Sequence, residues 1–197
     1  MKNNAEKAQL INLFSHVTKD AEEKASLLFD KYLSVRRIIN TDANSLAETL
    51  SGDMSSALYI RLVIAIVSRR FCDEFKFGKE HTEEEIEKYF TALFYGLPVE
   101  TAYVMSFNSS GKAVACDKIN EGVINFSSIL PRKIIEISKA RKAKSVIIAH
   151  NHPEGYAKAS SDDITSTKLL KSILESADIR LISHYVVADS ECVKIDL

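Results

Sequence analysis

Two histidines and an aspartate lie close together in the sequence, immediately after a short apolar run. His150 and His152 are separated by a single residue, and Asp163 follows shortly after them. Because alternate residues of an extended strand point to the same side, both imidazoles can bind one ion. Asp163 can add a carboxylate oxygen as the third ligand, which leaves a fourth tetrahedral position for water. This arrangement is typical of a catalytic rather than a structural zinc site.

Such a site would make hydrolytic chemistry available at neutral pH. A bound zinc ion lowers the pKa of its water from ~15.7 to roughly 7 and polarises a carbonyl oxygen. The reaction also needs a base that moves a proton and a donor that stabilises a developing oxyanion. A glutamate meets the first need, and Ser160 is the candidate for the second.

The elements around these residues place them at one end of a buried strand. Residues 145–149 are apolar and rich in β-branched side chains, which predicts a short buried strand that ends before Pro153. The next helix is expected over about residues 161–177. Ser160 and Asp163 have the spacing of a capping box at the start of that helix, and capping is compatible with catalysis.

The remainder of the C-terminal half alternates strands and helices, which predicts an α/β domain. A turn that contains Gly111 joins two strands as a hairpin. Pro131 opens a helix, because the first turn of a helix does not need its missing N–H. The expected elements are strands over 101–107 and 112–119, a helix from Pro131 to about Ala143, and strands over 180–188 and 192–195.

The N-terminal part has helical periodicity. Apolar residues recur three and four positions apart over about residues 8–75, which predicts four helices with Thr41 and Ser55 as N-caps. A polar stretch follows, and Thr82 opens a further helix. We therefore expect an all-α helical domain over 1–76, a linker and connecting helix over 77–97, and the α/β domain over 98–197.

The stretch that holds the candidate ligands resembles a known motif. His-x-His, seven residues and then Ser-x-x-Asp is the JAMM motif of the JAB/MPN metalloprotease fold, and His150, His152, Ser160 and Asp163 match it. The form His-Asn-His-Pro-x-Gly is similar to the RadC branch of this fold. The likeness covers about residues 98–197 and, more loosely, the helical part.

The resemblance implies an α+β domain of JAB/MPN type, layered as in cytidine deaminase, preceded by a small all-α domain. It implies one Zn²⁺ bound by His150, His152 and Asp163, and the motif spacing selects Asp163 over Asp162. His184, on an expected strand, is interpreted as a core residue or as a partner of a ligand rather than a ligand itself.

The resemblance also implies a reaction. The family has a glutamate at the start of the first strand, and Glu100 occupies that place, with Glu121 and Glu154 as rivals for the role of base. The implied protein is a zinc-dependent hydrolase that cleaves a peptide or isopeptide bond of a peptide or protein substrate, with Ser160 steadying the oxyanion. The alternatives are a DNA-associated accessory protein of the RadC type and an inactive MPN scaffold, although no ligand of the motif is broken.

Two departures from the family pattern bear on nucleic acid. Lys133 stands where the family usually has a glutamate, and Gly52 is the one glycine left where the family has the Gly-x-Gly turn of a helix-hairpin-helix-like unit. This degenerate hairpin gives little support to DNA contact. The basic run over residues 132–144 is interpreted as a solvated face, although it has enough charge to meet phosphates.

Composition sets the remaining bounds. The chain of 197 residues has 46% hydrophobic and 27% charged residues and a formal net charge of −1, which is ordinary for a globular protein. The polar N-terminus and the lack of a long apolar run favour a cytoplasmic protein without a membrane span. The three cysteines are odd in number and widely spaced, which argues against disulfides and against a thiolate zinc site.

Overall fold

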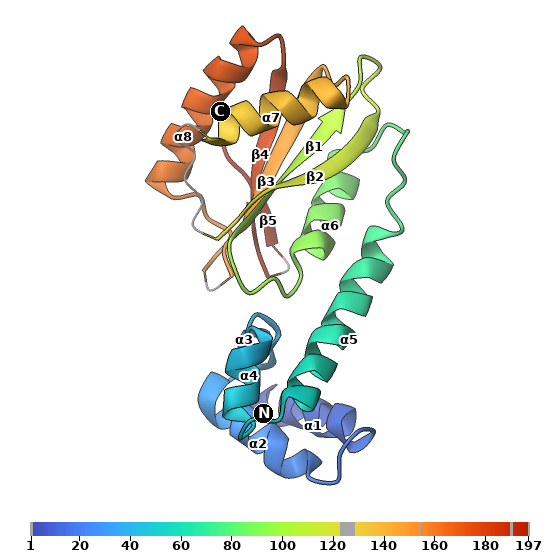
Figure 1. Cartoon of the computed structure of the whole chain (residues 1–197), viewed down its shortest axis with the longest axis vertical. Helices are drawn as coiled ribbons and strands as arrows, with labels where there is room; N and C mark the ends of the chain where they lie inside the picture. Colours follow the sequence, from blue (N-terminus) through green and yellow to red (C-terminus); the bar gives the residue numbers. More distant parts are fainter. Residues whose placement is uncertain (1, 123–128, 154, 190, 197) are drawn as a thin grey trace. The chain divides into compact units, whose positions relative to one another are not determined.

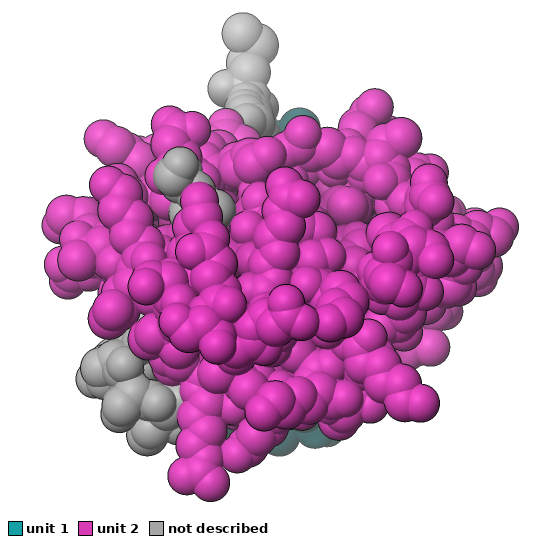
Figure 2. Space-filling view, turned by 90° about the horizontal axis from the view of Figure 1, so that it is seen from above, with its two compact units in different colours: residues 1–68, 96–98 teal, residues 69–95, 99–197 magenta. Residues whose placement is uncertain are grey.

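The computed structural model describes residues 2–122, 129–153, 155–189 and 191–196. The chain forms two compact units, Met1–Ser68 with Gly96–Pro98, and Arg69–Tyr95 with Val99–Leu197, which Figure 2 colours separately. The second unit therefore begins at Arg69 and includes most of the stretch 77–97 that we expected to be a linker and connecting helix. Glu154, one rival for the base, lies outside the described residues.

The described part of the first unit contains five helices, whereas the periodicity predicted four. The additional helix, α3, has five residues, which is too short to produce a periodic pattern. The expected caps were also wrong, because Asp42 rather than Thr41 caps α4, and Ser55 lies inside α5. The helices are α1 (Lys2–Ser15), α2 (Ala21–Tyr32), α3 (Val35–Ile39), α4 (Ala43–Thr49) and α5 (Met54–Cys72), around a core that includes Phe14, Leu28, Ile38, Leu46 and Ile60.

The second unit is built on one mixed sheet with the strand order β2-β1-β3-β4-β5. β3 and β4 are parallel, and every other neighbouring pair is antiparallel. The predicted hairpin and the predicted strands are confirmed, with small differences at their ends. The strands are β1 (Thr101–Phe107), β2 (Ala113–Glu121), β3 (Ser145–Asn151), β4 (Arg180–Ala188) and β5 (Glu191–Lys194).

Helices cover both faces of this sheet (Figure 1). α7 (Ile129–Ala140) and α8 (Ser161–Ser176) pack on one face, where Ile134 and Leu170 contact Val104 and Ile148 in one apolar core. α6 (Glu83–Phe94) packs on the other face, and Thr82 caps it as predicted. α7 begins two residues before Pro131. The layered α+β domain that the sequence predicted is confirmed.

The connection between β3 and β4 determines where a site can form. Parallel neighbours need a crossover, and α8 provides it, so the chain leaves β3 at its carboxyl end and enters α8 close by. Ligands of open α/β sheets bind at such carboxyl ends. Within the described residues, no helix has both the length and the apolar character needed to cross a bilayer.

Candidate metal centre

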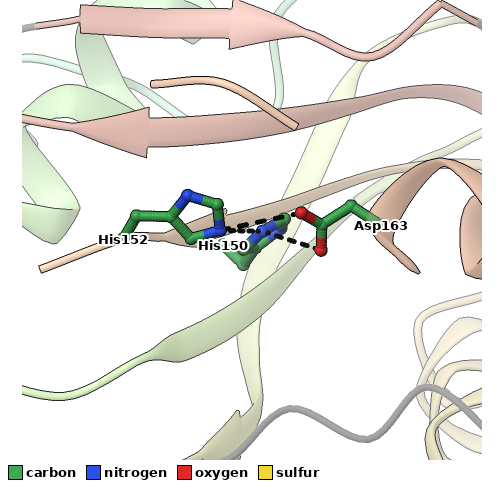
Figure 3. A group of neighbouring side chains, drawn as sticks. All are labelled: His150, His152 and Asp163. Atoms are coloured by element: carbon green, nitrogen blue, oxygen red, sulfur yellow. Dashed lines mark hydrogen bonds and ion pairs between the residues drawn. The ribbon is translucent and has the colours of Figure 1, made fainter. Parts of the chain in front are cut away.

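The three predicted ligands meet at the end of β3 (Figure 3). His150 Nε2 lies 3.1 Å from His152 Nε2 and 3.3 Å from Asp163 Oδ1, and His152 Nε2 lies 3.7 Å from Asp163 Oδ2. Among the described residues, this is the one group of three or more His, Cys, Asp or Glu side chains with ligand atoms close enough to hold a metal ion. The structure thus brings together the two histidines and the aspartate of the sequence motif.

The spacing of these atoms fits a tetrahedral ion. Zinc bonds of about 2.0–2.1 Å at tetrahedral angles place ligand atoms roughly 3.3 Å apart. The separations of 3.1 and 3.3 Å around His150 Nε2 match that edge length. Two imidazole nitrogens and one carboxylate oxygen are also a donor set that zinc accepts in catalytic sites. The residues present therefore fit a zinc ion without rearrangement of the backbone.

Strand pairing explains why His150 points into the protein. His150 pairs with Ala102 of β1 and with Val186 of β4, and it lies on the same side of the sheet as Ile148, which faces α7 and α8. The side chain is 1% exposed. His150 therefore approaches Asp163 at the start of α8 from beneath the helix.

Asp163 is held by the first turn of its own helix. Ser160 donates to Asp163 Oδ2 through both its backbone N–H, at 2.8 Å, and its hydroxyl, at 2.7 Å, while Asp163 N–H donates to Ser160 Oγ. Burial raises the pKa of Asp163, but the hydrogen bonds from His150 and Ser160 outweigh burial and hold the pKa below its ordinary value. The carboxylate is therefore ionised, with Oδ2 bound to the cap and nearest to His152, and Oδ1 nearest to His150.

His152 is positioned by the loop that follows β3. Its backbone N–H donates to Val187 O at 2.8 Å, and its Nδ1 lies 3.3 Å from Tyr156 O. A carbonyl can only accept, so Nδ1 carries the proton and Nε2 presents its lone pair to the site. Gly155 permits this close approach, because a Cβ there would lie 3.2 Å from the His152 Cβ.

His150 has a partner that the sequence motif does not contain. Its Nδ1 lies 2.8 Å from His184 Nε2, and His184 Nδ1 lies 2.7 Å from Thr167 Oγ1. Burial, and next the neighbouring His150, lowers the pKa of His184 well below its ordinary value. His184 thus contacts the remote nitrogen of a ligand, in keeping with our interpretation of it. Thr167 was missed, although it follows Asp163 by one helical turn on the buried face of α8.

Glu100 lies immediately before β1, the strand that pairs with β3. The pairing of β1 with β3 ends at Ala102 and His150, so Glu100 and His152 each lie two residues beyond the last pair. The flanking backbone is fixed by Asn151, whose Oδ1 accepts from Thr101 N–H at 2.8 Å and whose Nδ2 donates to Val99 O at 3.3 Å. Sequence reasoning gave Asn151 no role, although it lies between the two histidines.

The other candidates are placed less favourably. Glu121 is exposed at the end of β2, and its carboxylate forms an ion pair with Lys118 at 2.5 Å. Asp162 is exposed in the first turn of α8 and does not belong to the ligand group. Ser160 lies beside the ligands as predicted, but its hydroxyl donates to Asp163 rather than into open space.

The fold and the group of three possible metal ligands are those expected of a JAB-type domain. A family model described as the RadC-like JAB domain matches residues 81–196, which is more than half of the chain. The chain therefore belongs to the RadC-like JAB domain family, as the motif predicted.

Individual relatives agree with this assignment. A UPF0758 protein of Herminiimonas arsenicoxydans is 29% identical to this chain over 67% of this chain and 59% of that protein. A UPF0758 protein of Janthinobacterium sp. strain Marseille is 27% identical over 91% of this chain and 82% of that protein. A UPF0758 protein of Aliivibrio fischeri is 27% identical over 88% of this chain and 78% of its own. The match to the Herminiimonas protein spans less than two thirds of that protein's length. These names state no activity.

Proposed function

We propose that this protein is a zinc-dependent hydrolase of the JAMM type that cleaves a peptide or isopeptide bond. The observation that carries the proposal is the grouping of His150, His152 and the Asp163 carboxylate, in which His150 Nε2 lies 3.1 Å from His152 Nε2 and 3.3 Å from Asp163 Oδ1, close to the edge of a zinc tetrahedron. Membership of a JAB domain family, which includes metalloproteases, supports the same reaction class.

Each residue of the candidate site has its own role in the proposed hydrolysis. When bound, a zinc ion supplies an acidified water molecule and polarises the substrate carbonyl. Glu100 accepts the proton of the attacking water and passes it to the leaving amine, a role supported by its position two residues beyond the paired Ala102 and His150. His150, His152 and Asp163 would hold the ion.

Ser160 contributes chiefly by holding Asp163. Its hydroxyl hydrogen points to Asp163 Oδ2 at 2.7 Å, so a direct hydrogen bond to a substrate oxyanion requires that this bond be broken. The backbone cap would keep Asp163 in place during such a change, because Ser160 N–H donates to the same oxygen. We therefore assign Ser160 first to ligand positioning and second to oxyanion stabilisation.

Metal analysis tests the site. We expect the purified wild-type protein to retain one zinc ion per chain and the His152→Ala variant to lose it, since two remaining ligands hold zinc weakly. His81→Ala is a matched control, because His81 lies outside the ligand group and its ring contacts Lys76 O and Glu85. Equal zinc content in wild type and His152→Ala would exclude this site.

Cleavage of a peptide library tests the base. The Glu100→Gln variant should keep its zinc and lose turnover by roughly 10²–10⁴-fold, which is the usual contribution of general acid–base catalysis. Glu121→Gln serves as the control, because Glu121 is paired with Lys118 and should leave turnover unchanged. If Glu121→Gln were the inactive variant, the assignment of the base would be reversed.

A further inference from the structure

A buried chain of hydrogen bonds runs behind the candidate metal centre. It begins at the backbone carbonyl of Asp163, which accepts from Thr167 Oγ1 at 2.5 Å. It continues from Thr167 Oγ1 to His184 Nδ1 at 2.7 Å and from His184 Nε2 to His150 Nδ1 at 2.8 Å. Thr167 and His184 are both 0% exposed. The chain therefore links two of the three ligands through the protein interior.

The direction of each bond follows from the chemistry of its ends. A carbonyl can only accept, so the single hydroxyl hydrogen of Thr167 points to Asp163 O. Thr167 Oγ1 then has lone pairs only for His184, and His184 Nδ1 must carry a proton and donate it.

The burial of His184 determines which nitrogen carries the hydrogen of its bond with His150. A second proton on the His184 ring would put a charge in the core beside another imidazole, which is costly away from water. His184 Nε2 thus has a lone pair, and the hydrogen of the bond to His150 must come from His150 Nδ1. With its Nδ1 proton directed to His184, His150 turns its other ring nitrogen, Nε2, toward His152 and Asp163, where Nε2 can bind a metal ion.

We propose that His184 and Thr167 are positioning residues that fix His150 in the Nδ1–H tautomer and so prepare its Nε2 to bind the metal. The proposal rests on the proposed function for its choice of metal, but the proton arrangement belongs to the protein itself. His184 is not a fourth ligand, because it contacts the nitrogen of His150 that lies away from the other ligands.

The matching arrangement at His152 supports this role. There the Tyr156 carbonyl accepts from Nδ1, which fixes the same tautomer by a bond whose direction is unambiguous. Ligating histidines generally donate their second N–H to an acceptor that sets ring orientation and tautomer. At His150 the acceptor is another imidazole, and this imidazole needs Thr167 to hold its own proton on the far side.

Helix α8 offers a matched pair of threonines for the test. Thr165 and Thr167 both donate to the carbonyl one turn earlier, but Thr165 is exposed and Thr167 is buried against His184. We expect Thr167→Val to weaken zinc binding by roughly 10–100-fold, which is the usual effect of removing a partner of a ligand. Thr165→Val should bind as wild type does. Competition with a chromophoric chelator measures both affinities.

Two further variants separate the proton chain from packing. Thr167→Ser keeps the hydroxyl and should bind zinc nearly as tightly as wild type. His184→Gln keeps an amide with one donor and one acceptor group, and should bind more tightly than His184→Leu, which has neither. If Thr167→Val matches Thr165→Val, or if Leu and Gln at position 184 are equivalent, the proposal is overturned.

A measurement on the zinc-free protein makes the result independent of catalysis. Long-range ¹H–¹⁵N spectra of the imidazole rings report which nitrogen carries the proton. We expect His150 to show a protonated Nδ1 in wild type, and a mixture with the Nε2–H form in His184→Leu. An Nε2–H tautomer in the wild type would refute the proposal even if the protein binds zinc. Absence of zinc binding with the Nδ1–H tautomer intact would instead refute the proposed function.

Discussion

Asn151 separates the two candidate histidine ligands and reaches across to the backbone on either side of Glu100. Its amide oxygen accepts from Thr101 N–H and its amide nitrogen donates to Val99 O, so both peptide groups flanking Glu100 are bound to one side chain. Asn151 and Thr101 are buried. At the scale of single residues, the candidate site is therefore held in place by residues outside the motif as well as by those within it.

This arrangement predicts that Asn151→Ala impairs both stability and catalysis. The variant leaves a buried Thr101 N–H without its acceptor, which costs about 1–3 kcal/mol in the free energy of unfolding. Turnover should fall further than zinc affinity, because Glu100 is released while the three ligands remain. Urea unfolding, metal titration and peptide cleavage measure the three quantities.

Asn108→Ala is the control for this prediction. The Asn108 side chain also accepts from backbone N–H groups, of Ser110 and Lys112, but in an exposed turn away from the ligand group. A loss of turnover in Asn108→Ala equal to that in Asn151→Ala would show that the effect is not local to Glu100.

Secondary-structure elements place these residues through their ends. β3 contains His150 near its carboxyl end and leads directly to His152, and the capping box of α8 contains Asp163. The same device stabilises the first unit, where Asp53 precedes α5 and accepts from the Ser56 N–H at 3.0 Å and the Ser56 hydroxyl at 2.7 Å. Lys24 of α2 forms an ion pair with Asp53 at 2.7 Å and joins the two helices.

Removal of this cap should destabilise the first unit in a pH-dependent way. Asp53→Ala is expected to cost about 1–2 kcal/mol in the free energy of unfolding at pH 7. The hydrogen bond from Lys24, followed by those from Ser56, lowers the pKa of Asp53 below its ordinary value. A carboxylate with a lowered pKa stabilises the fold above its unfolded pKa of about 3.9, and this contribution is lost as the pH falls through the folded pKa.

Urea unfolding at pH 7 and at pH 3 checks this sign. The difference between wild type and Asp53→Ala should be smaller at pH 3. Asp20→Ala is the control, because Asp20 pairs with Lys24 at 3.1 Å but makes no capping bond with its side chain. An Asp53→Ala effect that grew on acidification would contradict the assigned pKa direction.

At the scale of the whole molecule, the distribution of charge determines whether the protein attracts nucleic acid. The formal net charge is −1, so the chain has no overall attraction for phosphates. The basic run at 132–144 is also partly neutralised, because Arg132 pairs with Glu136, Arg141 with Asp117, and Lys144 with Asp178. These pairs favour the solvated-face interpretation over a nucleic-acid surface.

We therefore expect the full chain to bind duplex DNA no more tightly than nonspecific binders do, with Kd values of roughly 10⁻⁴–10⁻⁶ M or weaker at physiological salt. Fluorescence anisotropy across a range of salt concentrations measures this directly. A steep salt dependence, corresponding to six or more phosphate contacts, would instead favour the DNA-associated alternative.

Some features of this protein are local in sequence, and the sequence was sufficient to predict them. His150, His152, Ser160 and Asp163 lie within one strand end, one loop and one helix start, so spacing alone places them near one another. The strands and helices of the second unit could also be predicted, because each one is long enough to show its own pattern of apolar residues. The helix α3 could not be predicted in this way, because five residues are too few to show a helical period.

Other features required the tertiary structure. His184 reaches His150 across 34 positions, because β3 and β4 pair in parallel through the α8 crossover. Asn151 reaches Val99 across 52 positions, because β1 and β3 pair antiparallel. Side-chain periodicity shows which face of a strand is buried, but not which strand lies beside it or in what register. The motif therefore determined the ligands, whereas strand pairing decided which residues hold them.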